Sequence, residues 1–266
     1  MTAYYNEIDP FAADWCEALI RAGHIAPGLV DRRSITEVQP DDLREFTQCH
    51  FFAGIGGWSL ALRLAGWDDR RPVWTGSCPC QPFSVAGAGR GTADERHLWP
   101  EFRRLIAECR PATVFGEQVA SRAGRNWLAG VRADLEALDY AVGAADLCAA
   151  SVGAPHIRQR LWWVADADQG QRGRLADGEG RHHDGQAAGW QQGDGIAQPS
   201  GAASRIGPWS DYVWIPCADG KARRIEPGLE PLAYGVPARV GRLRGYGNAI
   251  VPAVAAAFIQ AYLDAL

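Results

Sequence analysis

One stretch of the sequence has the pattern of a short strand, a glycine turn and an apolar helix in immediate succession. Cys49 to Phe52 is apolar enough for a buried strand, Gly54 to Gly57 follows as the turn, and Trp58 to Ala65 has helical spacing. Glycines let the backbone of such a turn approach a ligand, and the helix start offers free N–H groups. This order of elements therefore predicts an α/β fold with a cofactor-binding site at the glycine turn.

A second stretch, Pro72 to Gly87, holds a cysteine on a stiff backbone. A short apolar run breaks at Gly76 into a loop in which Cys80 is flanked by Pro79 and Pro82. Each proline fixes its own φ and restricts the preceding residue, which suits a nucleophile held still at the end of a strand. Residue types and spacing also leave open a buried strand end with inert thiols.

Length and composition indicate a globular protein. The 266 residues are enough for one α/β domain and a small second lobe. No apolar run approaches the roughly 18 residues of a membrane span, and the first nine residues are polar and acidic, unlike a signal peptide. The seven cysteines have no paired spacing, which favours a reducing compartment. We therefore expect a cytoplasmic monomer that does not enter a membrane.

The charged residues allow a local basic surface but not a general one. The net charge of −4 argues against a coat of nucleic acid over the whole molecule. Trp209 to Arg224 has the pattern of a hairpin turning at Asp219-Gly220, and Lys221, Arg223 and Arg224 make it basic. This hairpin is the predicted DNA-reading element, and a merely solubilising hairpin is the alternative.

The Pro-Cys loop resembles the catalytic loop of the DNA cytosine-5 methyltransferases, whose cysteine attacks C6 of a flipped cytosine. The matching run is Pro79-Cys80-Gln81-Pro82-Phe83-Ser84. The resemblance implies that Cys80 is the nucleophile and that Pro79, Gln81 and Ser84 contact the substrate. The glycine turn resembles the first motif of the same family, F-x-G-x-G-G, which holds the methionine part of S-adenosylmethionine. The implied cofactor residues there are Phe52, Gly54, Gly56 and Gly57.

Three later segments extend the resemblance. Glu117 follows a predicted strand as in the family's Glu-Asn-Val motif, where the Glu contacts N3 of the cytosine; Gln118 replaces the usual Asn. Arg158 and Arg160 lie in a run that resembles the family's Pro-Gln-x-Arg-x-Arg segment, with His156 where Gln is usual. The resemblance implies that Arg160 contacts the cytosine O2 and Arg158 the phosphates. Asn248 lies in a run like the last motif, which packs against the first and completes the cofactor pocket.

The order of the motifs departs from the family. The two strands that hold the adenosine are missing between the glycine turn and Cys80, but the N-terminal segment resembles them. Glu7 occupies the place of the glutamate that binds the ribose hydroxyls, and Asp31 that of the aspartate at the adenine amino group. The resemblance therefore implies a circular permutation, which keeps every strand's neighbours in a sheet of order 3-2-1-4-5. An unrelated N-terminal cap with a lost cofactor pocket is the alternative.

The implied architecture is a Rossmann-like S-adenosylmethionine-dependent methyltransferase sheet, circularly permuted, with a small target-recognition lobe. We expect residues 1–165 to form the catalytic domain, with the permuted cofactor-binding part in 1–66. Residues 166–238 would form the lobe, with a flexible insertion at 166–208 that is rich in Gly, Gln, Asp and Arg. Residues 239–266 would return to the catalytic domain. His182-His183-Asp184 lacks a distant ligand pair, so we expect no metal site.

The implied activity is that of a DNA cytosine C5-methyltransferase. S-adenosylmethionine would donate a methyl group to C5 of a flipped cytosine in double-stranded DNA, through a covalent adduct between Cys80 and C6. Two alternatives stay open. One is an enzyme that activates the same carbon for another electrophile or outcome, such as hydroxymethylation or deamination. The other is an inactive homologue that only binds DNA.

Overall fold

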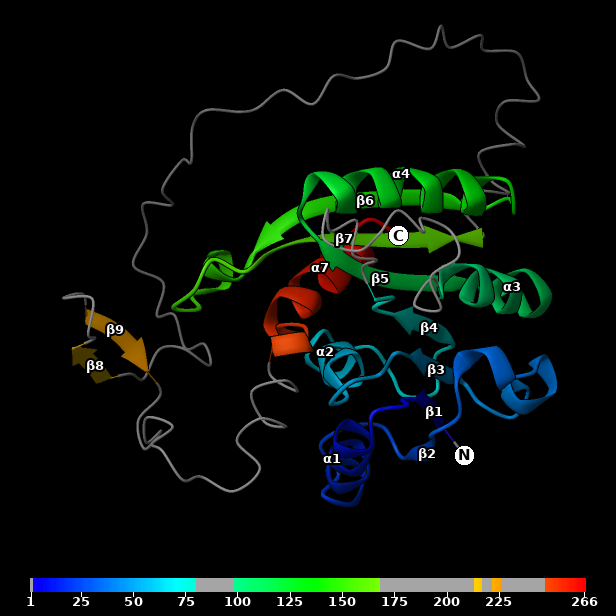
Figure 1. The fold of residues 1–266 in the computed structure, drawn as a ribbon, viewed down its shortest axis with the longest axis horizontal. Helices are drawn as coiled ribbons and strands as arrows, with labels where there is room; N and C mark the ends of the chain where they lie inside the picture. The colour runs from blue at the N-terminus through cyan, green and yellow to red at the C-terminus, as the bar shows by residue number, and fades with distance from the viewer. Residues whose placement is uncertain (1, 80–97, 168–212, 217–221, 226–246) are drawn as a thin grey trace, which may run out of the picture.

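The structure is a computed structural model that describes residues 2–79, 98–167, 213–216, 222–225 and 247–266 (Figure 1). A seven-stranded sheet with helices on both faces forms its centre. The strands of this sheet are β1 (Ala3–Asn6), β2 (Gly28–Asp31), β3 (Gln48–Phe51), β4 (Val73–Gly76), β5 (Thr113–Val119), β6 (Ala141–Cys148) and β7 (Gln159–Asp166). The α/β class predicted from the sequence is confirmed.

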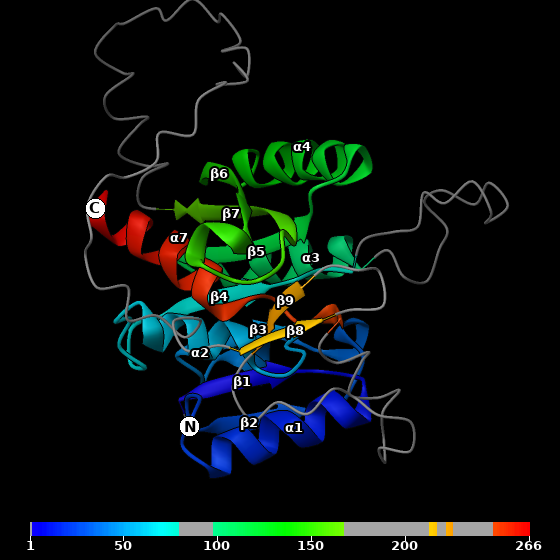
Figure 2. The same ribbon diagram turned by 90° about the vertical axis from the view of Figure 1, so that its left-hand side faces the viewer.

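The strand order is β2-β1-β3-β4-β5-β7-β6, and Figure 2 shows this succession from the bottom of the sheet to the top. The first five strands in this order are mutually parallel, and β7 runs antiparallel to both β5 and β6. The opening strand β1 therefore lies beside β3, which leads into the glycine turn. This neighbourhood is the one that the permuted motif order requires, and the permutation itself stays a prediction.

Within the described ranges, five helices accompany the sheet: α1 (Pro10–Arg21), α2 (Gly57–Leu64), α3 (Trp99–Cys109), α4 (Arg122–Glu136) and α7 (Pro252–Asp264). Three short 3₁₀ turns in the same ranges are η1 (Ile35–Glu37), η2 (Pro40–Leu43) and η3 (Ala149–Val152). Helix α1 begins at Pro10, because the Asp9 carboxylate accepts from the amides of Phe11 and Ala12. Strand β2 ends at Asp31, and Ser34 caps η1 shortly beyond it.

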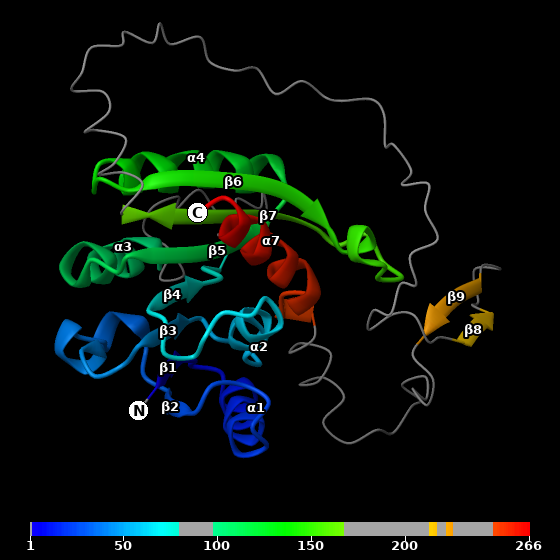
Figure 3. The same ribbon diagram turned by 180° about the vertical axis from the view of Figure 1, so that it is seen from behind.

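Neighbouring strand residues point to opposite faces of the sheet and fill different cores. Tyr4 and Trp163 pack with α3 and α4, which lie in front of the sheet in Figure 1. Trp162 packs with α2 and α7, and Tyr5 packs with α1, all on the face seen in Figure 3. The consecutive tryptophans of β7 thus anchor helices on both faces of the sheet.

A separate two-stranded sheet consists of β8 (Val213–Pro216) and β9 (Ala222–Ile225), paired antiparallel with Val213 opposite Ile225. The predicted hairpin is confirmed in these strands, while its expected turn lies outside the described residues. The division into a catalytic domain and a recognition lobe stays a prediction. None of the helices in the described ranges combines the length and apolarity that crossing a membrane requires.

Candidate active site

The glycine turn lies between β3 and α2, at the carboxyl edge of the parallel strands. Phe52, Gly54 and Gly56 have positive φ, of 52°, 56° and 76°. A Cβ on Gly54 would meet no heavy atom of the described residues within 4 Å, whereas one on Gly57 would lie 2.8 Å from Ile250 Cγ1. The turn is therefore open at Gly54 and closed by packing at Gly57, so a ligand can approach the backbone at Gly54.

Glu7 follows β1 and reaches this turn. One carboxylate oxygen accepts from the Gly54 amide at 2.7 Å, and the other accepts from the Asp9 amide at 2.8 Å. Burial raises the pKa of Glu7, and the backbone hydrogen bonds oppose that rise. Two predicted cofactor residues, Glu7 and Gly54, thus lie in direct contact although they are 47 residues apart in the sequence.

Asp31, at the end of β2, has its carboxylate engaged by protein donors. It accepts from the Tyr4 hydroxyl at 2.7 Å and from the Arg33 guanidinium at 2.6 Å. Partial burial works to raise the pKa of Asp31, but hydrogen bonds from Arg33 and Tyr4 outweigh it and lower that pKa. The predicted adenine contact of Asp31 would have to compete with Arg33. Arg33 belongs to none of the motifs in the sequence, and its closeness to Asp31 along the chain is the only signal for it.

Glu117 and Arg160 form an ion pair at the carboxyl end of β5. The Arg160 Nε lies 2.7 Å from Glu117 Oε1, and the two side chains are 20% and 11% exposed. The register explains the pair, since Arg160 on β7 is opposite Val119, two residues beyond Glu117 on the same face. Burial raises the pKa of Glu117, and Arg160 and Arg158 oppose the rise. The site therefore holds a carboxyl group that is easier to protonate than an exposed one.

Gln118 connects this strand to the segment that leads into the Pro-Cys loop. Its Nε2 donates to the Cys78 carbonyl at 3.3 Å, and its Oε1 accepts from the Val119 amide at 2.8 Å. Cys78 is buried and Pro79 is exposed. In the sequence, Gln118 stands out only as a departure from the family pattern. The structure gives it a contact next to the loop.

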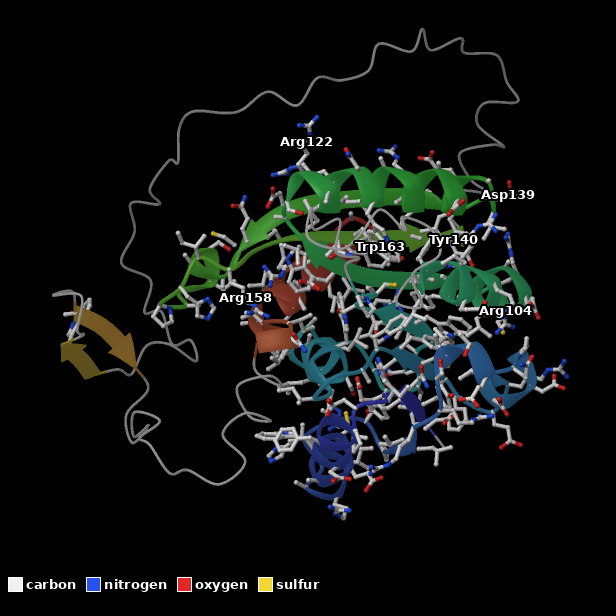
Figure 4. All side chains as sticks on the ribbon, viewed as in Figure 1. Arg104, Arg122, Asp139, Tyr140, Arg158 and Trp163 are labelled. Carbon is white, nitrogen blue, oxygen red and sulfur yellow. The ribbon has the colours of Figure 1, made fainter. Side chains whose placement is uncertain are left out.

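Arg158 contacts the segment in front of α7. Its Nη2 donates to the Gly247 carbonyl at 2.8 Å and to the Ala249 carbonyl at 2.5 Å. Figure 4 shows Arg158 beside the start of that helix. Asn248, a predicted cofactor residue, lies between the two acceptors and is exposed. The structure therefore brings the predicted base-binding and last-motif segments together.

The remaining predicted site residues are only partly described. Arg223 and Arg224 lie in β9, opposite Ile215 and Trp214 respectively. Four further residues lie outside the described residues: Cys80, Gln81, Ser84 and Lys221. Over the part of the chain that the structure describes, no group of three or more His, Cys, Asp or Glu side chains is arranged to hold a metal ion. The His182-His183-Asp184 run, at which we expect no metal, lies outside that part.

Comparison with known proteins identifies the central segment. Residues 69–174 match the family model of the C-5 cytosine-specific DNA methylases. The chain is 31% identical over 150 residues to the Type II methyltransferase M.AplI of Arthrospira platensis, covering 43% of this chain and 44% of that protein. It is 28% identical over 167 residues to the Type II methyltransferase M.HhaI of Haemophilus parahaemolyticus, covering 48% and 51%.

Among solved structures, that of a Spodoptera frugiperda DNMT2 mutant has a TM-score of 0.40 at 13% identity, covering 62% of this chain and 50% of that one. The chain spans about half the length of the first two curated relatives. The matched segment contains Cys80, Glu117, Arg158 and Arg160. Through this segment, the chain is similar to the C-5 cytosine-specific DNA methylases.

Proposed function

We propose that this chain methylates C5 of a cytosine in double-stranded DNA, with S-adenosylmethionine as the methyl donor and Cys80 as the covalent nucleophile. The observation that carries the proposal is the ion pair between the buried Glu117 and the half-buried Arg160, joined at 2.7 Å at the carboxyl edge of the sheet. Ligands and reacting groups gather at this edge in open parallel α/β sheets. The segment before Cys80 ends at the same edge, because β4 is paired with β5 there.

Each residue has a distinct role in the proposed reaction. The Cys80 thiolate adds to C6, forming an S–C6 bond, while Glu117 supplies a proton at N3 of the ring. Arg160 donates to the cytosine O2 and holds the Glu117 carboxyl in place. After C5 has taken the methyl group, the C5 proton passes to water and its bonding electrons re-form the C5–C6 double bond. The S–C6 bond breaks with its electrons on the Cys80 sulfur, and N3 returns its proton to Glu117. Pro79, Gln81 and Ser84 would line the base from the Pro-Cys loop.

The chain's residues fit the methyl donor at the glycine turn. S-adenosylmethionine supplies an electrophilic methyl group when it is bound. Gly54 has open space beside it, and the adjoining Glu7 carboxylate has further lone pairs with which to accept from ribose hydroxyls. Asn248 and the glycines of the turn would complete the pocket. For Asp31 to accept from the adenine amino group, its hydrogen bond from Arg33 would have to break. In this proposal the permuted segment 1–66 does the work of the family's adenosine-binding strands.

DNA binding is assigned to two parts of the chain. Residues 1–165 and 239–266 would form the catalytic domain, and residues 166–238 the recognition lobe. Lys221, Arg223 and Arg224 of the hairpin would contact the duplex, and their charges would make binding weaker as salt rises. Flipping the cytosine costs a few kcal/mol of unstacking, which such contacts help to offset.

Methylation-sensitive sequencing of DNA from cells that express the chain tests the proposal. We expect 5-methylcytosine within a defined sequence context, absent from cells that carry the empty vector. Uracil or hydroxymethylcytosine at that context would show the same activation of the base with another outcome. Unchanged DNA, with the purified chain still retaining duplex, would contradict the proposal and leave a DNA-binding homologue.

A further inference from the structure

We propose that Arg158 is a positioning residue that fixes the C-terminal segment against the catalytic domain and so links the base site to the methyl-donor turn, rather than a phosphate ligand. The proposal rests on the proposed function for what the two sites bind. It does not rest on it for the contacts themselves, which the described residues provide.

One nitrogen of Arg158, Nη2, donates two hydrogen bonds. Both acceptors are backbone carbonyls, of Gly247 and Ala249, at 2.8 and 2.5 Å. A terminal guanidinium nitrogen has two hydrogens, so these bonds use all that Nη2 can donate. They join segments that are 89 and 91 residues apart in the sequence. Arg158 therefore binds the segment that directly precedes α7.

The segment that Arg158 binds also contacts the glycine turn. Ile250, next along the chain, is buried against α2, and a Cβ on Gly57 would lie 2.8 Å from its Cγ1. Gly57 is the first residue of α2 and belongs to the predicted cofactor turn. Holding Ala249 therefore also holds Ile250 against the turn that would bind the methyl donor.

Arg158 also lies close to the two residues that are proposed to bind the base, Glu117 and Arg160. It lies two residues before Arg160, which is paired with Glu117, and its charge is felt by Glu117. The backbone of Arg158 has a φ of +33°, in the left-handed region that non-glycine residues seldom occupy. The Arg158 guanidinium lies beside the start of α7 (Figure 4), whereas Arg160 is paired with Glu117.

The experiment compares the full chain with Arg158→Gln, Arg158→Lys and the control Arg44→Gln. Arg44 is an exposed arginine paired with Asp41. It precedes the start of β3 and so lies at the amino ends of the parallel strands, away from the candidate site at their carboxyl ends. Hydrogen–deuterium exchange is followed in peptides from residues 247–264. Binding of S-adenosylmethionine is measured by calorimetry, and binding of a mixed-sequence duplex is measured over a range of salt concentrations.

We expect Arg158→Gln to speed exchange in residues 247–256 and to weaken donor binding about tenfold, the effect of losing hydrogen bonds from a charged group. The salt dependence of duplex binding should stay as in the wild type. Arg158→Lys should restore part of the protection, and Arg44→Gln should match the wild type in every measurement.

Unchanged exchange in Arg158→Gln, with duplex binding weakened and its salt slope lower by about one, would overturn the proposal and make Arg158 a phosphate ligand. If the wild type binds no S-adenosylmethionine, the proposed function fails, while the exchange measurement still decides whether Arg158 clasps the C-terminal segment. If Arg158→Gln does not fold, the exchange rates of Arg158→Lys decide the matter.

Discussion

Glu117 is held between two opposing influences on its protonation. Burial raises the pKa of its carboxyl, and the nearby guanidinium groups of Arg160 and Arg158 work against that rise. A general acid is most effective when its pKa is close to the working pH. The local environment of Glu117 therefore suits the transfer of a proton to the cytosine ring.

Replacing Glu117 by Gln should remove that proton while keeping the shape of the side chain. We expect kcat to fall by about 10²- to 10⁴-fold, the usual contribution of a positioned acid, with little change in duplex binding. Steady-state transfer of tritiated methyl groups measures the effect. Glu45→Gln, at an exposed glutamate, is the control and should keep the wild-type kcat. Equal kcat in Glu117→Gln and the wild type would remove Glu117 from the chemistry.

The buried His50 should make the free energy of unfolding depend on pH. Its ring is buried in β3, with Nδ1 2.8 Å from the Thr75 hydroxyl, and burial lowers its pKa to about 3. The unfolded chain has a histidine pKa of about 6.5 and so binds the proton first as pH falls. The stability that this difference contributes is fully present above pH 6.5 and is lost as pH falls from there towards 3.

Urea unfolding at about pH 7.5 and about pH 5 measures this loss. Between these values the wild type should lose on the order of 2 kcal/mol more than His50→Gln, which has no imidazole to protonate. The comparison is made within each protein, so a general destabilisation by the substitution cancels. An equal pH dependence in both proteins would show that His50 is not the titrating group.

At the scale of elements, local signals predict most boundaries, and contacts between elements do not follow from them. The succession from Cys49 to Ala65 gives β3, the turn and α2, and Asp9 gives the start of α1. The ion pair of Glu117 with Arg160 requires β7 to lie antiparallel to β5 in one register. That register depends on packing on both faces of the sheet, so the sequence alone leaves it open.

Gly116 illustrates a position that only packing explains. A Cβ there would lie 2.1 Å from Cζ2 of Trp163, a fully buried side chain labelled in Figure 4. We expect Gly116→Ala to lower the free energy of unfolding by about 1–3 kcal/mol, the cost of overpacking a core.

The matched control is Gly130→Ala within α4, where a Cβ meets no described atom within 4 Å. It should raise the free energy of unfolding by about 1 kcal/mol because alanine has the higher helix propensity. Urea denaturation of both variants tests the pair of predictions. Equal effects of the two substitutions would show that Trp163 can move aside.

At the scale of the whole molecule, the chain's opening segment lies where the resemblance needs an adenosine-binding edge. The contact of Glu7 with Gly54 could be anticipated, because both residues belong to recognisable motifs. The bonds of Asp31 to Arg33 and of Arg158 to Gly247 could not. These hydrogen bonds depend on which of several donors lies close enough to a given carboxylate or carbonyl in the folded chain. The spacing of motifs in the sequence does not predict that distance.

Glu7→Ala tests the role of this opening segment. It should weaken binding of S-adenosylmethionine by about 10- to 100-fold, because hydrogen bonds to a charged group contribute about 1.5–3 kcal/mol. Calorimetry gives the dissociation constants, and Asp14→Asn on the outer side of α1 is the control, with its side chain 69% exposed. Unchanged affinity in Glu7→Ala would contradict the permuted arrangement and favour an unrelated N-terminal cap.

If Cys80 attacks the cytosine, replacing its sulfur by the less nucleophilic oxygen of serine should stop methyl transfer without preventing DNA binding. Wild type and Cys80→Ser are each incubated with duplex DNA and tritiated S-adenosylmethionine, and the label in 5-methylcytosine is counted. We predict label with the wild type and none with Cys80→Ser, while both proteins retain the duplex in a binding assay. Methyl transfer by Cys80→Ser at the wild-type rate would contradict the account.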